Sequence, residues 1–239
     1  MHDAEKRRAA WRKLQNFWDY HKWLLLIGAF LLALGGYGVR TALAQKETAF
    51  SGVFVNFHAR EESTLAAQFA QYAQLDTKTC DVLLDDGISI TADYTQGTMA
   101  ALQAMLARIH AGELDVLAAD AEVFRLYANS TSEILMDLRQ CLDAELLLRL
   151  DGRIYYIDRA FGPAVAQSAA SEAQYAALEF PDPFSPEEME DPIPVGIAID
   201  DLPRIQAIYG TSPTPRYLGV VSNTRHAETA AQFVAFLLD

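Results

Sequence analysis

The sequence has few of the residues that build cross-links and metal sites. Its 239 residues include only two cysteines and five histidines. Two cysteines are too few for a disulfide scaffold or for a zinc site with four cysteine ligands. No two histidines stand at the spacing of metal ligands on a helix. We therefore expect neither a metal site nor another cofactor.

The familiar signatures of catalysis are also missing. The sequence contains no G-x-S-x-G elbow, no Walker A loop, and no G-x-G-x-x-G after a predicted strand. Neighbouring acids such as Asp85 and Asp86 fall at predicted turns, where Asp caps helices or faces water. We expect a non-enzymatic protein, with an extracytoplasmic hydrolase of unrecognised motif as an alternative.

Basic residues are scarce and unevenly placed. The chain carries 19 Lys and Arg against 32 Asp and Glu, a net charge of −13. Residues 1–40 hold seven basic and three acidic residues, so the acidity lies in the rest of the chain. Nucleic acid is not expected as a partner, because its binding requires a basic face. About half of the residues are apolar, which is enough for a packed core in one or two domains.

One uncharged run, residues 23–39, interrupts this pattern, with Lys22 and Arg40 at its ends. As a helix it would span about 26 Å, close to the roughly 30 Å hydrocarbon thickness of a bilayer. Six basic residues precede it, so the positive-inside rule places residues 1–22 in the cytoplasm. We predict a single-pass transmembrane helix in the cell membrane, held by the lipid bilayer, with the C-terminal domain extracytoplasmic.

A cleaved signal peptide is the alternative to this anchor. The apolar core, 24–34, is short, and an A-x-A pattern that ends at Ala44 would allow cleavage before Gln45. Cleavage would release a secreted solute-binding protein. The long basic leader, and the position of Arg40 between the core and the cleavage pattern, favour the uncleaved anchor.

After a linker at 40–50, residues 51–239 read as one α/β domain in which strands alternate with helices. This alternation predicts a mostly parallel sheet with helices on both faces. The stretch 179–194 holds five prolines and six acids, and we expect an exposed, extended loop there. The expected strands are 52–57, 80–84, 113–120, 152–158, 193–199 and 217–222, with a short piece at 88–90. The expected helices are 59–75, 95–112, 121–129, 131–150 with a break inside it, 200–210 and 228–239.

Two segments resemble bacterial extracellular solute-binding proteins: LDVLAADAEVFRLYANSTSEILMDL at 114–138 and YLGVVSNTRHAETAAQFVAFLLD at 217–239. The leader YHKWLLL resembles those of small single-pass bacterial proteins that carry such domains. The resemblance implies a type 2 periplasmic-binding-protein-like lobe. It departs from the transport family in two ways: the exterior region is too short for two full lobes, and no cysteine near residue 45 could be lipidated. A fold of this kind does not by itself imply transport.

In open α/β sheets, ligands bind beyond the carboxyl ends of the strands, where helix N-termini offer free N–H groups. Three predicted turns qualify: 93–97, 120–122 and 222–224. The alternative is that all three only cap helices, and Asp120 in particular should cap the helix that follows it. The candidate ligand-binding residues are Thr95, Asp120, Ser222, Asn223 and Thr224.

Cys80 and Cys141 could pair outside the cell, but spacing alone cannot show that they meet. We expect two small, partly buried hydrophobic residues rather than a disulfide. The function that fits these observations is a membrane-anchored binding or interaction domain. Its partner would be a small-molecule ligand or a membrane protein.

Overall fold

The computed structural model describes residues 23, 27, 30–35, 46–59, 63–90, 96–168, 174–175 and 177–239, with the side chains of 96–98 excepted. The chain forms two compact units, Met1–Lys46 and Glu47–Asp239. In the first unit, residues 23, 27 and 30–35 are helical. None of the described helices combines the length and the hydropathy that crossing a bilayer requires. The predicted segment 1–22 and most of the predicted helix 23–39 lie outside the described residues.

The second unit contains a six-stranded sheet in the order β2-β1-β3-β6-β5-β4, counted over the described residues. β1 pairs in parallel with β2 and β3, whereas β3–β6, β6–β5 and β5–β4 are antiparallel pairs. The strands are β1 (Glu47–Val55), β2 (Cys80–Asp85), β3 (Val116–Asp120), β4 (Ile154–Asp158), β5 (Pro192–Ala198) and β6 (Arg216–Val220).

The α/β class is therefore confirmed, but a parallel arrangement holds only for β1, β2 and β3. Parallel neighbours need a crossover that carries the chain to the other end of the sheet. α2 and α3 provide such crossovers, whereas the segment that contains α8 returns the chain beside β5, so that β6 runs back antiparallel. The alternation of strands and helices along the sequence does not distinguish these two kinds of connection.

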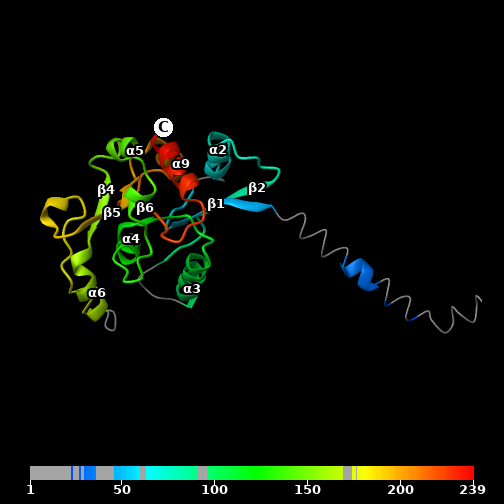
Figure 1. Ribbon diagram of the computed structural model, residues 1–239, viewed down its shortest axis with the longest axis horizontal. Coiled ribbons are helices and arrows are strands. Elements are labelled where there is room, and N and C mark those ends of the chain that lie inside the picture. The colour runs from blue at the N-terminus through cyan, green and yellow to red at the C-terminus, as the bar shows by residue number, and fades with distance from the viewer. Residues whose placement is uncertain are drawn as a thin grey trace, which may run out of the picture. The chain divides into compact units, whose positions relative to one another are not determined.

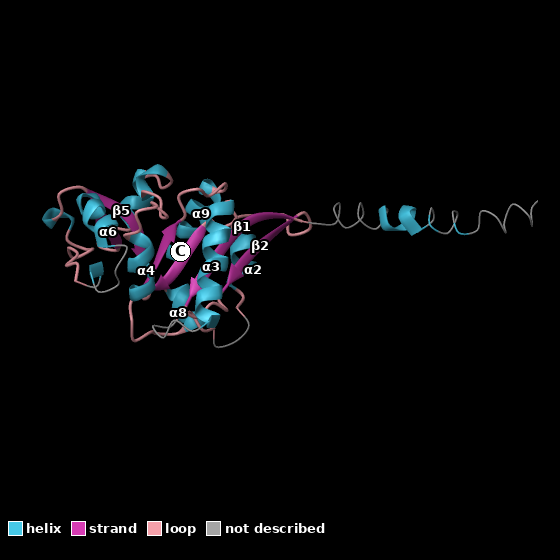
Figure 2. Cartoon of the chain, turned by 90° about the horizontal axis from the view of Figure 1, so that it is seen from below, coloured by secondary structure: helices cyan, strands magenta, loops and turns pink. Residues whose placement is uncertain are grey.

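Helices cover both faces of the sheet. Figure 1 shows α5, α9 and α2 above the strands and α6, α4 and α3 below them. Figure 2 views the chain from that lower side, where α6, α4 and α3 follow one another across the strands. The helices are α2 (Leu65–Tyr72), α3 (Gln96–Ala111), α4 (Ala121–Ala128), α5 (Ala144–Arg149), α6 (Gly162–Ser168), α8 (Pro203–Tyr209) and α9 (Ala227–Leu238), with short 3-10 helices η1 (Leu138–Gln140), η2 (Arg159–Phe161) and η3 (Pro186–Glu188).

The alternation of side chains along β1 creates two hydrophobic cores. Phe50 and Phe54 face α2 and α9, and the ring of Phe50 lies 4.9 Å from that of Phe233. Val53 and Val55 face the opposite way, toward α3 and α4, where Met105 is fully buried. Because successive residues of a strand point to opposite faces, one strand supplies both cores.

Most predicted elements are found, with shifted ends. β1 begins at Glu47, inside the stretch that we predict as a linker, and η3 interrupts the predicted loop 179–194, in which β5 begins. The predicted helical stretch 131–150 is interrupted, as expected, and only η1 and α5 are helical within it, so the prediction is wrong for the residues before η1. Asp137 caps η1 by accepting a hydrogen bond from the Arg139 N–H, and Asp143 caps α5. Leu135 instead forms an antiparallel bridge with Val221, so residues before η1 follow the sheet.

Candidate functional site

The topology places a switch point beside β1. α2 leads to β2 on one side of β1, whereas α3 leads to β3 on the other side. The carboxyl ends of β1 and β3 therefore flank the position where open α/β sheets bind ligands. Asn56 directly follows β1 there, and Asp120 ends β3.

Asn56 links the two strand ends. Its side-chain amide donates a hydrogen bond of 2.6 Å to Oδ2 of Asp120. Its Oδ1 accepts from the N–H of Ile90 at 2.8 Å, and its own N–H donates to the carbonyl of Ile88. The backbone of Asn56 has a φ of 62°, in the left-handed region that Asn tolerates better than most residues. Asn56 is not among the residues predicted from the sequence; its signal is an Asn placed immediately after a buried strand.

Asp120 caps α4, as predicted. Its Oδ1 accepts a hydrogen bond of 3.0 Å from the N–H of Val123, and its Oδ2 accepts from Asn56. Both oxygens of the carboxylate are thus engaged within the fold. Beside them, between α3 and α4, lies a cavity of about 220 Å³, whose lining includes Leu106 and Tyr127.

Tyr127 is a polar residue of this cavity whose hydroxyl has no hydrogen-bond partner among the described residues. Its side chain lines the cavity and is 7% exposed. Burial raises the pKa of Tyr127 to about 12, so the phenol is neutral at physiological pH. No hydrogen bond joins its hydroxyl to another described residue, although buried phenols usually have a partner. Thr95, the candidate residue before α3, lies outside the described residues.

The turn at 222–224 does not lie at the switch point beside Asp120. Because β6 runs antiparallel to β3, the carboxyl end of β6 lies beside the start of β3. Asp120 lies at the other end of these strands. This candidate turn therefore lies apart from the one at Asp120. Asn223 donates its side-chain N–H to the carbonyl of Ile109, at the end of α3.

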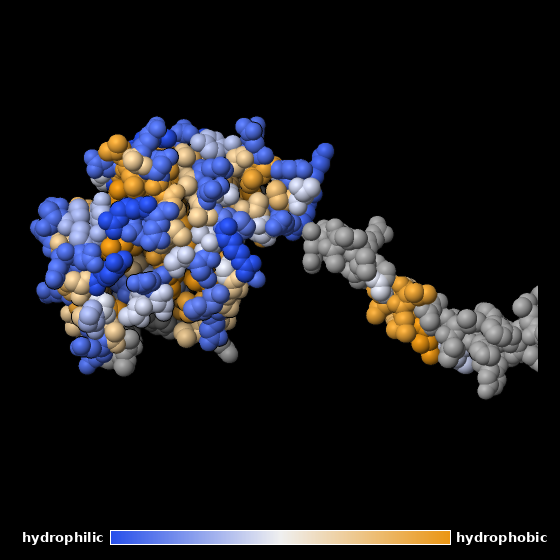
Figure 3. Space-filling view, viewed as in Figure 1, coloured by the Kyte–Doolittle hydropathy of each residue, from blue (hydrophilic) through white to orange (hydrophobic). Residues whose placement is uncertain are grey.

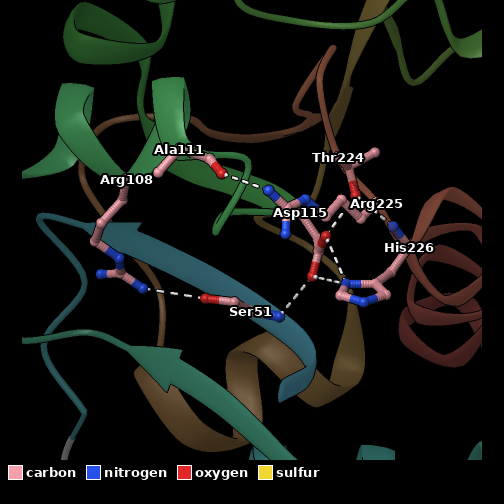
Figure 4. Close-up of polar contacts among 7 residues, drawn as sticks. All are labelled: Ser51, Arg108, Ala111, Asp115, Thr224, Arg225 and His226. Atoms are coloured by element: carbon pink, nitrogen blue, oxygen red, sulfur yellow. Dashed lines mark hydrogen bonds and ion pairs between the residues drawn. The ribbon is translucent and has the colours of Figure 1, made fainter. Parts of the chain in front are cut away.

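Thr224 instead belongs to a cluster around the buried Asp115, which is 1% exposed (Figure 4). The Asp115 carboxylate accepts hydrogen bonds from the Thr224 hydroxyl and from the Ser51 N–H, the latter at 2.7 Å. Nδ1 of His226 lies 3.2 Å from both of its oxygens. Arg108 donates to the Ser51 hydroxyl at 3.1 Å. The cluster ties β1 to the start of β3 and the turn before α9, so its geometry indicates a structural role.

A larger cavity, of about 460 Å³, lies between the end of α4 and the segment that contains η2 and α6. Its apolar lining includes Leu135, Ile193 and Val195, all buried. Its polar lining comes mostly from the turn after α4 and from the ends of strands. The polar lining residues are Asn129, Ser130, Thr131, Glu133, Asp137, Gln140, Asp158, Arg159 and Ser222. Ser222 is thus a predicted candidate that reaches a cavity, although not the one at the switch point.

Two carboxylates of this cavity are already bonded within the fold. Burial alone would raise the pKa of Asp158, but hydrogen bonds from the backbone N–H groups of Ala160, Glu190 and Asp191 hold it below its usual value. Asp137 likewise has a lowered pKa: its burial is outweighed by hydrogen bonds from Arg139, including one of 2.6 Å. These acids position the η1 and η2 turns, which leaves Glu133, Arg159 and the neutral polar groups of the lining to meet a ligand.

The described residues offer little redox or metal chemistry. Cys80 and Cys141 are free thiols, whose Sγ atoms donate to the carbonyls of Asp76 and Leu138. Burial raises the pKa of Cys141 to about 11, which keeps the thiol protonated. Within the part of the chain that the structure describes, no three His, Cys, Asp or Glu residues gather as metal ligands.

Comparison with known proteins identifies no relative: no family model matches the chain, and no curated protein is significantly similar to it.

Proposed function

We propose that this protein is a non-enzymatic, membrane-anchored protein whose α/β domain binds a small solute outside the cytoplasm. The observation that carries the proposal is the cavity of about 460 Å³ beside α4. This volume falls within the roughly 300–1,000 Å³ of small-molecule sites, and an apolar floor with a few polar groups is their usual character. Part of the solute-binding-like sequence 114–138, between residues 128 and 137, lines this cavity and supports the same conclusion.

The cavity favours a neutral or weakly polar solute. Leu135, Ile193 and Val195 supply apolar contact area, while Asn129 and Ser130 supply hydrogen-bonding groups without net charge. Asp137 and Asp158 are held by hydrogen bonds from within the fold, so they are not free to pair with a cation. The other two charged residues of the lining, Glu133 and Arg159, carry opposite charges, so the lining has no excess of either sign from them. A ligand would therefore gain most of its affinity from apolar burial and its orientation from the turn after α4.

The N-terminal unit supports the anchor. Its described helical residues, 23, 27 and 30–35, are apolar and exposed: Leu32 is 79% exposed and Phe30 is 64% exposed. Figure 3 shows these residues as an orange group. Water does not favour such a surface, whereas lipid does. We propose that residues 23–39 span the bilayer, with the basic residues of 1–22 beside anionic headgroups.

A ligand screen with a cavity-filling variant tests solute binding. The full chain in detergent micelles is screened by thermal shift against a panel of sugars, amino acids and organic acids. Ala166 lines the cavity and is exposed, so Ala166→Trp should fill it without disturbing the core. Gln167→Trp, on the next, exposed residue that does not line the cavity, is the matched control.

A panel member that binds should raise the melting temperature of the wild type and of Gln167→Trp, but not of Ala166→Trp. Equal shifts in both variants would place the binding elsewhere. A panel without any hit would count against solute binding and favour capture of a membrane protein by this domain.

The anchor is tested separately. The chain is expressed with a C-terminal tag, the membranes are washed with carbonate, and the N-terminus of the tagged product is determined by mass spectrometry. An intact leader in the washed membranes is expected. A soluble product that begins at Gln45 would refute the anchor and support the secreted alternative.

A further inference from the structure

A third cavity lies on the other side of α4, between the start of that helix and the segment 178–183. It is open, with a volume of about 680 Å³. Tyr155 of β4 and Tyr217 of β6 form its floor, and Phe180 lines it from the segment above. None of these three residues lines the 460 Å³ cavity, so an inference from this site is independent of the proposed function.

The two tyrosines have hydroxyl groups without a partner. Tyr155 is 6% exposed and Tyr217 is 7% exposed, yet both line the cavity. No hydrogen bond joins either phenol oxygen to another described residue. Burial raises the pKa of Tyr155 to about 12, and burial followed by the charge of Asp182 raises that of Tyr217. The rings are buried, but both residues line the open cavity, so their phenol oxygens can accept a hydrogen bond from a group that enters it.

The positions of the two rings are fixed by packing. Their centroids lie 4.9 Å apart at an interplanar angle of 62°. The ring of Phe124 lies behind them, 5.1 Å from that of Tyr155, and Phe184 lies 6.0 Å from Tyr217. The phenol oxygens therefore do not have to be ordered when a ligand binds, which reduces the entropic cost of binding.

The charge around the floor is mainly negative. Three carboxylates line the cavity, those of Glu122, Glu179 and Asp182, against one guanidinium, that of Arg125. Asp182 accepts hydrogen bonds from the Phe184 N–H at 3.1 Å and from the Ser185 hydroxyl at 3.3 Å, so Glu122 and Glu179 are the carboxylates left to meet a cation. No ion pair joins the four charged residues to one another among the described contacts. A site with this excess of carboxylates and with aromatic faces attracts cations.

We propose that this cavity binds a small organic cation with a primary ammonium group. The N–H groups of the ligand are donated to the phenol oxygens of Tyr155 and Tyr217. The carboxylates at the rim balance its charge, and its alkyl part lies against the aromatic rings. A primary ammonium fits better than a quaternary one, because only the primary ammonium has N–H groups for the two unpartnered oxygens.

Three probes of similar size separate these contributions. Butylammonium carries both the charge and the N–H donors, tetramethylammonium carries the charge alone, and butyrate reverses the charge. Each is titrated into the full chain in detergent micelles by isothermal titration calorimetry at constant ionic strength. We expect butylammonium to bind with a Kd of about 1 mM or tighter, tetramethylammonium at least about threefold more weakly, and butyrate not at all.

Variants place the binding at the phenols. Tyr155→Phe and Tyr217→Phe retain the rings and should each weaken butylammonium binding by about three- to tenfold. Tyr156→Phe is the matched control on the same strand: Tyr156 does not line the cavity, and its change should leave the Kd unchanged. Glu179→Gln should weaken binding and reduce its dependence on salt. Melting curves followed by circular dichroism verify that each variant folds.

Each contrary result has a definite meaning. Tight binding of butyrate, or no binding of butylammonium at about 20 mM, overturns the proposal. Binding that survives in the Tyr155→Phe/Tyr217→Phe double variant places the cation elsewhere, which overturns it as well. Equal affinity for tetramethylammonium refutes donation to the phenols. None of these results bears on the cavity that Ala166 lines, so this proposal and the proposed function fail independently.

Discussion

Replacing Asp115 with alanine should destabilise the domain more than any change at an exposed ion pair. Asp115 is 1% exposed and accepts hydrogen bonds from Ser51, Thr224 and His226. The variant leaves the N–H of Ser51, itself in a residue that is 2% exposed, without an acceptor and away from water. A buried donor left in this way costs about 1–3 kcal/mol.

The other two donors should add less. Thr224 and the ring of His226 are partly exposed, so hydrogen bonds to water replace part of the bonding to Asp115 that they lose. We therefore expect the free energy of unfolding to fall by about 2–4 kcal/mol in Asp115→Ala. Thr224→Val removes one donor and leaves the carboxylate bonded to the others, so it should cost about 1 kcal/mol. Thr224→Val allows the loss in free energy of unfolding to be measured even where Asp115→Ala does not fold.

Asp85→Ala is the matched control. Asp85 also carries a carboxylate near β1 and pairs with Arg108 at 3.2 Å, but its side chain is 45% exposed. Exposed ion pairs contribute about 0–1 kcal/mol, so this change should be nearly neutral. All three tryptophans of the chain lie within residues 1–23. Urea unfolding should therefore be followed by far-ultraviolet circular dichroism, since tryptophan fluorescence would report on the N-terminal unit. A loss in Asp115→Ala no larger than that in Asp85→Ala would refute the reasoning.

Three further changes test other parts of the fold. Gly196→Ala would place a Cβ 2.7 Å from Cε1 of Phe124 and should cost about 1–3 kcal/mol in urea unfolding, part of which Phe124→Leu should restore. Asp120→Ala removes the cap of α4 and the bond to Asn56, and should lower the melting temperature by an amount equivalent to about 1–2 kcal/mol. Because the pKa of Asp158 is lowered in the fold, its contribution to stability is complete above about pH 4 and is lost as the pH falls further. The free energy of unfolding of Asp158→Asn should therefore depend less on pH below about 4 than that of the wild type. An unchanged dependence on pH in this range would contradict the lowered pKa of Asp158.

Local signals predicted the elements that depend on neighbouring residues. Asp120 caps α4 as expected, because a cap needs only a side-chain oxygen two or three residues before a free N–H. Gly210 follows α8 with a φ of 67°, where a residue without a Cβ is favoured. Strand β2 also begins at Cys80 as predicted. The helical prediction before η1 was wrong because Leu135 pairs with Val221, which lies far along the chain.

The candidate site was predicted only in part. Asp120 lies at the switch point as expected, and Ser222 lines the cavity of about 460 Å³ instead. Asn56 and Tyr155 were missed. The sequence shows an Asn after one strand and a Tyr within another, but it does not show which residues of other strands they contact. Two tyrosines separated by 61 positions, Tyr155 and Tyr217, form one floor only because β4 and β6 both lie next to β5.

The sequence by itself determined the α/β class, the caps, the acidity of the domain and the apolar N-terminal run, because each is written in composition or in short-range spacing. The tertiary structure decided the direction of β6. That direction depends on whether a connection crosses the sheet or turns back, and residues close together in sequence do not encode this choice. Because β6 runs antiparallel to β3, Thr224 lies beside Asp115 at one end of β3, while Asp120 lies with Asn56 at its other end.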